Sequence, residues 1–84
     1  MTKGKPYNGY PSWNVWNVCL WINNESELYK SCSEVAELYK EKKLTKEEAI
    51  CDLLRIVFWA FSGKTPDGAR VSKRAVKTWI ELYS

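Results

Sequence analysis

The stretch YPSWNVWNVCLWINN, residues 10–24, carries three of the five tryptophans of this 84-residue chain and no charged side chain. On a helix, at about 100° per residue, its apolar side chains cover well over half of the circumference. A helix that is apolar on most sides lies in the middle of a fold. We therefore expect a helix over about residues 12–23 against which the rest of the chain packs. The expected core arc consists of Trp13, Val15, Trp16, Val18, Cys19, Leu20 and Ile22.

The remaining sector of this helix holds Asn14, Asn17, Trp21 and Asn24. Two interpretations of it stay open. In the structural one, Asn14 and Asn17 form hydrogen bonds across helices or to the N-terminal arm and fix how the tryptophans pack. In the functional one, the sector is an exposed surface of amides and indoles, a composition typical of interface hot spots and of base-stacking platforms.

The composition describes one small, tryptophan-rich domain. The chain is 45% hydrophobic and 27% charged, which is not typical of disorder, and its many aromatic side chains each bury a large area. Residues 1–9, MTKGKPYNG, predict a flexible N-terminal arm that becomes ordered near Tyr7 to Tyr10. Residues 10–84 are expected to form a single helical domain.

Capping motifs predict where four helices begin. A side-chain oxygen at the N-cap satisfies a free backbone N–H, and a glutamate three residues later completes a capping box. Two such boxes are present, Asn24 with Glu27 and Thr45 with Glu48. The predicted caps are Ser12, Asn24, Thr45 and Ser72, and the predicted helices span about 12–23, 25–42, 46–61 and 73–83.

Apolar residues recur with helical spacing in the three later helices, and strand signals are weak throughout. These patterns predict an all-α fold, a compact four-helix bundle with short connections. Trp59 departs from the apolar stripe of its helix and shares a face with charged residues. The expected core residues are Leu28, Cys32, Val35, Ala36 and Tyr39, then Ile50, Leu53, Leu54, Val57, Phe58 and Phe61, then Ala75, Val76, Trp79, Ile80, Leu82 and Tyr83.

The connection between the last two predicted helices combines turn signals with positive charge. Gly63 suits the left-handed position that ends a helix, and TPDG at residues 65–68 matches a type I turn. Residues 63–77 carry five cations and one acid, in a chain of net charge +3. The segment is either a solvated basic surface or a binding site for anions or nucleic acid. The candidate contacts are Lys64, Arg70, Lys73, Arg74 and Lys77, with Lys3 and Lys5 as an auxiliary arm.

No catalytic or metal-binding constellation is visible. Without histidine, Ser-His-Asp and Cys-His catalysis and histidine-containing zinc sites are excluded. The run Gly63-Lys64-Thr65 resembles the end of a phosphate-binding loop, but Phe58 stands where that loop needs its first glycine, and a helix precedes it instead of a strand. We expect a protein that is not an enzyme and needs no cofactor or metal.

The three cysteines have neither disulfide nor metal-ligand spacing. Cys19, Cys32 and Cys51 each fall on an apolar helical face, so we expect them to be small buried hydrophobic side chains. No signal peptide is visible at the N-terminus, and the uncharged run 6–24 is too polar to cross a membrane. An intracellular protein without membrane contact is expected.

Residues 9–29, GYPSWNVWNVCLWINNESELY, resemble a family of small uncharacterised proteins encoded by bacteriophages and other mobile elements. The shared pattern is G-Y-x-S-W-N-x-W-N-V-x-L-W-I-x-N, followed by an acidic residue and L-Y. The resemblance implies a compact phage accessory protein in the cytoplasm of a bacterial host, and it carries no catalytic residues. Phage proteins of this size commonly bind host machinery or defence systems, including CRISPR effectors.

Three functions are therefore expected, in order of preference. The first is binding and modulation of a host protein, such as anti-CRISPR-like inhibition, by exposed residues flanked by the basic segment. The second is nucleic-acid binding through that segment, and the third is self-association through the first helix or Trp59. A DNA mimic is disfavoured because the chain is net positive. The candidate partner-binding residues are Trp59, Trp21, Asn14, Asn17 and Tyr7.

Overall fold

A computed structural model describes residues 7–83 and confirms the predicted all-α four-helix bundle. Residues 1–6, most of the predicted arm, and Ser84 lie outside the described part of the chain. Within it, the only extended pairing consists of two isolated backbone bridges. The helices are α1 (Trp13–Asn24), α2 (Ser26–Lys40), α3 (Lys46–Phe61) and α4 (Lys73–Tyr83).

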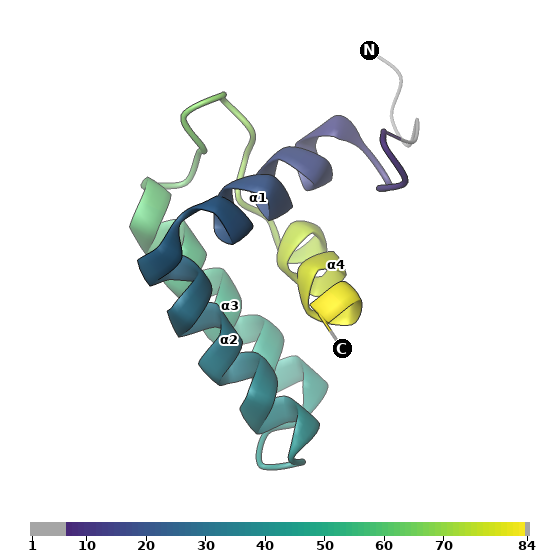
Figure 1. Cartoon of the computed structure of the whole chain (residues 1–84), viewed down its shortest axis with the longest axis vertical. Helices are drawn as coiled ribbons and strands as arrows, with labels where there is room; N and C mark the ends of the chain where they lie inside the picture. The colour runs from purple at the N-terminus through teal and green to yellow at the C-terminus, as the bar shows by residue number, and fades with distance from the viewer. Residues whose placement is uncertain (1–6, 84) are drawn as a thin grey trace.

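The four helices form two packed pairs. Figure 1 shows α2 and α3 side by side as a long hairpin, with α1 crossing one end of it and α4 packed beneath α1. The connection between α3 and α4, residues 62–72, extends beyond α1 before the chain returns to the core (Figure 1). This route brings a loop near the C-terminus against the first helix.

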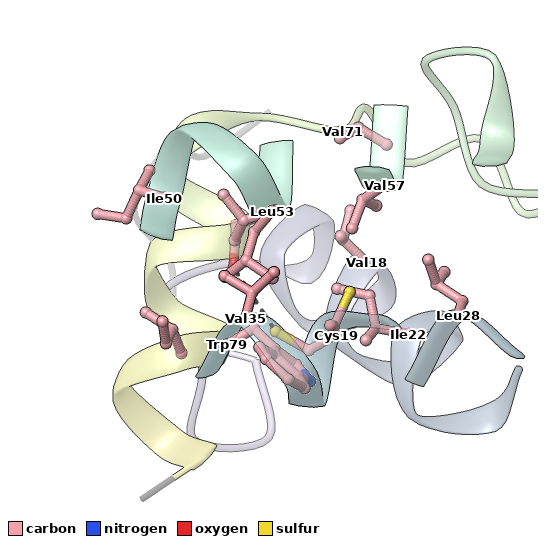
Figure 2. Packing of buried hydrophobic residues seen from close by; sticks show 14 of the residues in the cluster. Val18, Cys19, Ile22, Leu28, Val35, Ile50, Leu53, Val57, Val71 and Trp79 are labelled. Carbon is pink, nitrogen blue, oxygen red and sulfur yellow. Dashed lines mark hydrogen bonds between the residues drawn. The ribbon is translucent and has the colours of Figure 1, made fainter. Parts of the chain in front are cut away.

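Side chains from all four helices and from the α3–α4 connection meet in one hydrophobic core (Figure 2). Val18 and Ile22 of α1 are completely buried, as is Leu53 of α3, so α1 lies at the centre of the fold as its sequence predicts. Trp79 of α4 is also buried, and its indole N–H donates to Asn23 Oδ1 at 2.9 Å. That bond ties α4 to the C-terminal end of α1.

Three of the four predicted caps are confirmed. Ser12, Thr45 and Ser72 each accept a hydrogen bond from the backbone N–H three residues later, at 3.3, 3.1 and 3.2 Å. Glu48 completes the predicted capping box by accepting from the Thr45 N–H at 2.9 Å. These side chains fix the starts of α1, α3 and α4.

The predicted capping box at Asn24 is wrong. α1 continues through Asn24, and Glu25 alone connects it to α2 without any side-chain cap. The Glu25 N–H donates to the Trp21 carbonyl at 3.1 Å, which completes the last turn of α1. Glu25 therefore occupies the N-cap position of α2. Asn24 is the last residue of α1 and cannot cap the second helix.

Four residues expected in the core lie at the surface. Trp13 is 40% exposed, Phe58 54% and Leu82 60%, and Cys51 is exposed as well. Helical periodicity predicts which residues share a face, but the width of the covered sector depends on how many neighbouring helices contact that face. Each of these four side chains lies on a part of its helix that no neighbouring helix fully covers.

Candidate interaction surfaces

The polar sector of α1 faces the α3–α4 connection. The Asn14 side chain pairs with the backbone of Arg70: its Nδ2 donates to the Arg70 carbonyl, and its Oδ1 accepts from the Arg70 N–H, both at 2.8 Å. One amide thus satisfies both backbone polar groups of a residue 56 positions away, as a paired strand would.

Asn17 extends this pairing into the interior. Its Oδ1 accepts from the Thr65 hydroxyl at 2.6 Å, and the Thr65 hydroxyl oxygen accepts from the Ala69 N–H at 3.0 Å. Asn17 is 1% exposed and Thr65 is 4% exposed. Because a buried polar group without a partner costs about 1–3 kcal/mol, this chain of bonds fixes where the connection lies.

Asp67 receives two donors from α1. Its Oδ2 accepts from Asn17 Nδ2 and from Trp21 Nε1, each at 3.0 Å. The bonds from Asn17 and Trp21 stabilise the ionised form and lower the pKa of the Asp67 carboxyl below its ordinary value of 3.8. We call the residues that join α1 to the connection the amide lock, namely Asn14, Asn17, Trp21, Thr65, Asp67 and Arg70.

One of the two turn signals of the connection is confirmed. The Gly68 N–H donates to the Thr65 carbonyl at 2.8 Å, which closes the predicted TPDG turn. Gly63 has a positive φ of +94°, and its N–H donates to the Phe58 carbonyl at 3.0 Å, but the left-handed residue that caps α3 is Ser62, with a φ of +54°, and not Gly63 as the sequence predicts. A Cβ at Gly63 would lie 3.2 Å from the Phe58 ring, so a side chain at this position would require that exposed ring to shift.

The amide lock corresponds to the structural interpretation of the α1 polar sector. Asn17 is buried, so its predicted contact with a partner does not fit this structure. Asn14 and Trp21 are partly exposed but already engaged in hydrogen bonds. Within residues 7–83, their partner is the α3–α4 connection and not another helix. The sequence contains one hint of this pairing. The asparagines of α1 and the turn-rich connection at residues 62–72 both carry polar groups that need hydrogen-bond partners.

Tyr7, the fifth candidate partner-binding residue, packs back on α1. Its ring centroid lies 4.8 Å from that of Trp16, and its backbone pairs with Tyr10 through bonds of 2.9 and 2.8 Å. The expected ordering of the chain near Tyr7 to Tyr10 is thus present. Tyr7 remains 40% exposed at the edge of α1.

Trp59, unlike Tyr7, is almost fully exposed to solvent. It is 86% exposed, and the adjacent Phe58 is 54% exposed, whereas Leu53 and Val57 on the other side of α3 are completely buried. The buried side holds α3 rigidly in the bundle, so the two aromatic side chains project from a fixed support. We call the exposed surface of α3 around these residues, with the hollows on either side of Trp59, the Trp59 face.

The two hollows differ in charge. One lies between α3 and the start of α2, with an apolar floor that includes Leu28 and Phe61 and a rim that includes Glu25 and Glu27. The other runs along α3 and is lined by Cys51, Leu54, Arg55, Phe58 and Trp59. No residue of 64–77 lines either hollow, so the basic segment is not part of the Trp59 face.

The five candidate cations of residues 63–77 are exposed, and the structure distributes them over the connection and α4, whereas Lys3 and Lys5 lie outside the described residues. Lys64 and Arg70 face each other across a backbone bridge in the connection. Lys73 forms an ion pair with Glu47 of α3 at 3.5 Å. The remaining two cations are Arg74 and Lys77, in the first half of α4.

An aromatic cluster was missed from the sequence because side chains of two helices, α2 and α4, build it together. The rings of Tyr29, Trp79 and Tyr83 contact one another with centroid separations of 5.2 to 6.5 Å, and Lys40 Nζ lies 5.7 Å from the Tyr83 centroid. Leu82 borders the hollow beside this cluster. The rings are too close together to admit a ligand between them, so the cluster connects α2 to α4.

The two buried cysteines have thiols of low reactivity. Burial raises the pKa of the Cys19 and Cys32 thiols to about 12 each, so both stay protonated and poorly nucleophilic. Cys51 is exposed, which corrects the expectation that all three are buried. Among residues 7–83, no three His, Cys, Asp or Glu side chains lie close enough to hold a metal ion together.

Comparison with known proteins places the chain in a family. Residues 3–82 match the model of a family of unknown function, DUF7249, and the chain belongs to that family. The matched region contains all of the amide lock and the Trp59 face. No curated protein and no solved structure matches the chain. In the described part of the chain, none of the helices has the length and apolar character needed to span a bilayer.

Proposed function

We propose that this protein is a non-enzymatic binding module that attaches to a host protein through the Trp59 face and modulates it. The observation that carries the proposal is the 86% exposure of Trp59 on a helix whose other side is fully buried. Tryptophan is the residue most enriched at interface hot spots. A phage accessory protein that inhibits a defence system in the bacterial cytoplasm is the specific form of this proposal.

The energetics support a protein partner. Covering the Trp59 and Phe58 side chains removes a large apolar area from water, at about 25 cal/mol per Å². Because α3 is held by Leu53 and Val57, little backbone entropy is lost when the face is covered. An interface of ordinary size, about 1,200–2,000 Å² in total, extends beyond these two side chains onto α2.

Cys51 provides a direct test, because it lines the hollow beside Trp59 while the other two cysteines are buried. A photo-cross-linker attached to the Cys51 thiol is expected to capture one specific protein from bacterial lysate. Unlabelled wild-type protein and the Leu82→Ala variant should compete for that protein, and Trp59→Ala should not. Equal competition by Trp59→Ala would contradict the proposal.

Nucleic-acid binding is the second candidate, and the orientation of Asp67 favours it. The only acid within 63–77, Asp67, accepts two bonds from α1 through its Oδ2. Of the five exposed cations of the segment, only Lys73 forms an ion pair within residues 7–83, with Glu47. Exposed lysine and arginine side chains can neutralise phosphates. Fluorescence anisotropy with labelled single-stranded and duplex DNA should then show binding that weakens as salt rises. The Arg70→Ala/Arg74→Ala/Lys77→Ala variant should bind more weakly than Lys30→Ala/Lys42→Ala/Lys43→Ala, and no binding at low salt would contradict this candidate.

A further inference from the structure

The Trp59 face also indicates the chemistry of what it binds. We infer that it takes an amphipathic helix whose apolar side chains are flanked by lysine or arginine. This inference rests on the proposed function and specifies the partner. The charges of the face, its shape and the absence of a usable strand edge each contribute to it.

The charge of the face is net negative. Glu25 and Glu27 are exposed on the rim of one hollow, and no cation of residues 7–83 forms an ion pair with either of them. In the other hollow, Arg55 lies 3.8 Å from Asp52, which offsets its charge. An occupant that places basic side chains beside Glu25 and Glu27 has the complementary charge, and nucleic acid does not.

The shape of the face suits side chains inserted on both sides of Trp59. The indole stands between the two hollows and lines both of them. On one side, the floor includes Leu28 and Phe61, and on the other it includes Leu54 and Phe58. Apolar side chains spaced three or four residues apart on a helix can enter both hollows and enclose the indole.

A strand is a poorer occupant than a helix. Peptides that bind as added strands need an exposed strand edge with free backbone groups. Among residues 7–83 the only extended pairings are the Tyr7–Tyr10 and Lys64–Arg70 bridges, and neither lines a hollow of the Trp59 face. A helical surface such as α3 packs against another helix through interlocking side chains.

A second copy of the chain is also disfavoured. In a two-fold symmetric dimer the same patch meets itself. Pairing two Trp59 faces would bring together two surfaces of the same net negative charge, and like charges at an interface oppose association.

The inference can be tested with two labelled, helix-stapled peptides that share one apolar face of leucine and phenylalanine. One peptide carries lysines beside that face and the other carries glutamates. Fluorescence anisotropy measures the affinity of each for the wild type and for Glu25→Lys/Glu27→Lys, Glu34→Lys/Glu41→Lys and Trp59→Ala. Circular dichroism checks that every variant stays helical.

The wild type should bind the lysine peptide at least about tenfold more tightly than the glutamate peptide. Glu25→Lys/Glu27→Lys should reverse this preference, Glu34→Lys/Glu41→Lys should retain it, and Trp59→Ala should lose affinity for both peptides. Equal binding of the two peptides, or no binding of either, would overturn the inference.

The same variants separate failure of the inference from failure of the proposed function. If the protein captured through Cys51 depends on Trp59 but the peptide preference is absent, only the assignment of a basic helix falls. If neither capture nor peptide binding depends on Trp59, both the proposed function and the inferred basic helical partner are contradicted. A wild-type dimer in sedimentation that Trp59→Ala dissociates would assign the face to a second copy and overturn the inference.

Discussion

Trp21 and Trp59 are both candidate partner-binding residues from sequence, yet the structure gives them opposite environments. Trp21 donates its indole N–H to Asp67 within the amide lock, whereas Trp59 is 86% exposed on α3. The difference lies in the surroundings of each indole. Trp21 shares its helical sector with asparagines that find partners in a turn-rich loop, and Trp59 has charged neighbours on its own helix.

Trp21 and Trp59 thus represent two roles, one in stabilising the fold and one proposed in binding a partner. The amide lock uses polar side chains to hold a long connection against the core, a role measured by the free energy of unfolding. The Trp59 face leaves apolar side chains uncovered, a role measured by binding. Four variants or conditions test the division, and the expected effect on stability decreases from the first to the last.

The largest effect is expected for Asn17→Ala. The substitution removes the bonds of the Asn17 side chain to Thr65 and Asp67 and leaves a small cavity beside buried groups. We expect a loss of about 2–4 kcal/mol in the free energy of unfolding, measured by urea denaturation. A loss below about 1 kcal/mol would mean that the buried amide does not hold the connection.

Asn14→Ala should cost less, about 1 kcal/mol, because water can replace the amide at this partly exposed position. The loss should be local to the connection. Hydrogen exchange of the Arg70 amide, which donates to Asn14 Oδ1, should accelerate strongly. Asn24→Ala, at an exposed position on the same helix, serves as the control and should leave that exchange rate unchanged.

Asp67 gives the lock a dependence on pH. Because folding lowers the pKa of this carboxyl from 3.8, its charge stabilises the fold fully above that value. The contribution is lost as pH falls below 3.8 and through the lower folded pKa. The stability difference between wild type and Asp67→Asn should thus be constant near neutral pH and shrink in acid, as measured by denaturation at several pH values. A difference independent of pH would exclude the charge as its source.

The smallest effect on stability is expected for Trp59→Ala, within about 0.5 kcal/mol of wild type, because the side chain is hardly covered in the free protein. The same urea titration used for Asn17→Ala measures it. Strong destabilisation would show that Trp59 belongs to the fold and would remove the contrast with the amide lock. Small destabilisation with lost partner capture would sharpen that contrast.

Local features of the fold could be predicted because their causes are local. The caps at Ser12, Thr45 and Ser72 need only a side-chain oxygen and a backbone N–H three residues later. The turn at residues 65–68 likewise closes on itself. The predicted cap at Asn24 was wrong because it depended on where α1 ends. That end is set by the packing of α1 against α2.

The candidate sites could be predicted only in part. The exposure of Trp59 follows from its place among charged neighbours, off the apolar stripe of its helix. The exposure of Phe58 and Cys51 does not, because periodicity cannot show how much of α3 its neighbours cover. The acidic rim of the Trp59 face also escaped prediction, since Glu27 lies on α2 and Glu25 connects α1 to α2, both away from α3 in the sequence.

By itself, the sequence determined that residues 10–24 contain a central helix and that three further helices pack with it. Burial of the apolar arc and capping of each helix are encoded within a few turns of chain. Only the tertiary structure decided what the asparagines of that helix do. Their partners lie about 50 residues away on a connection whose path depends on all four helices, so no local pattern could show that Asn14 and Asn17 bind it.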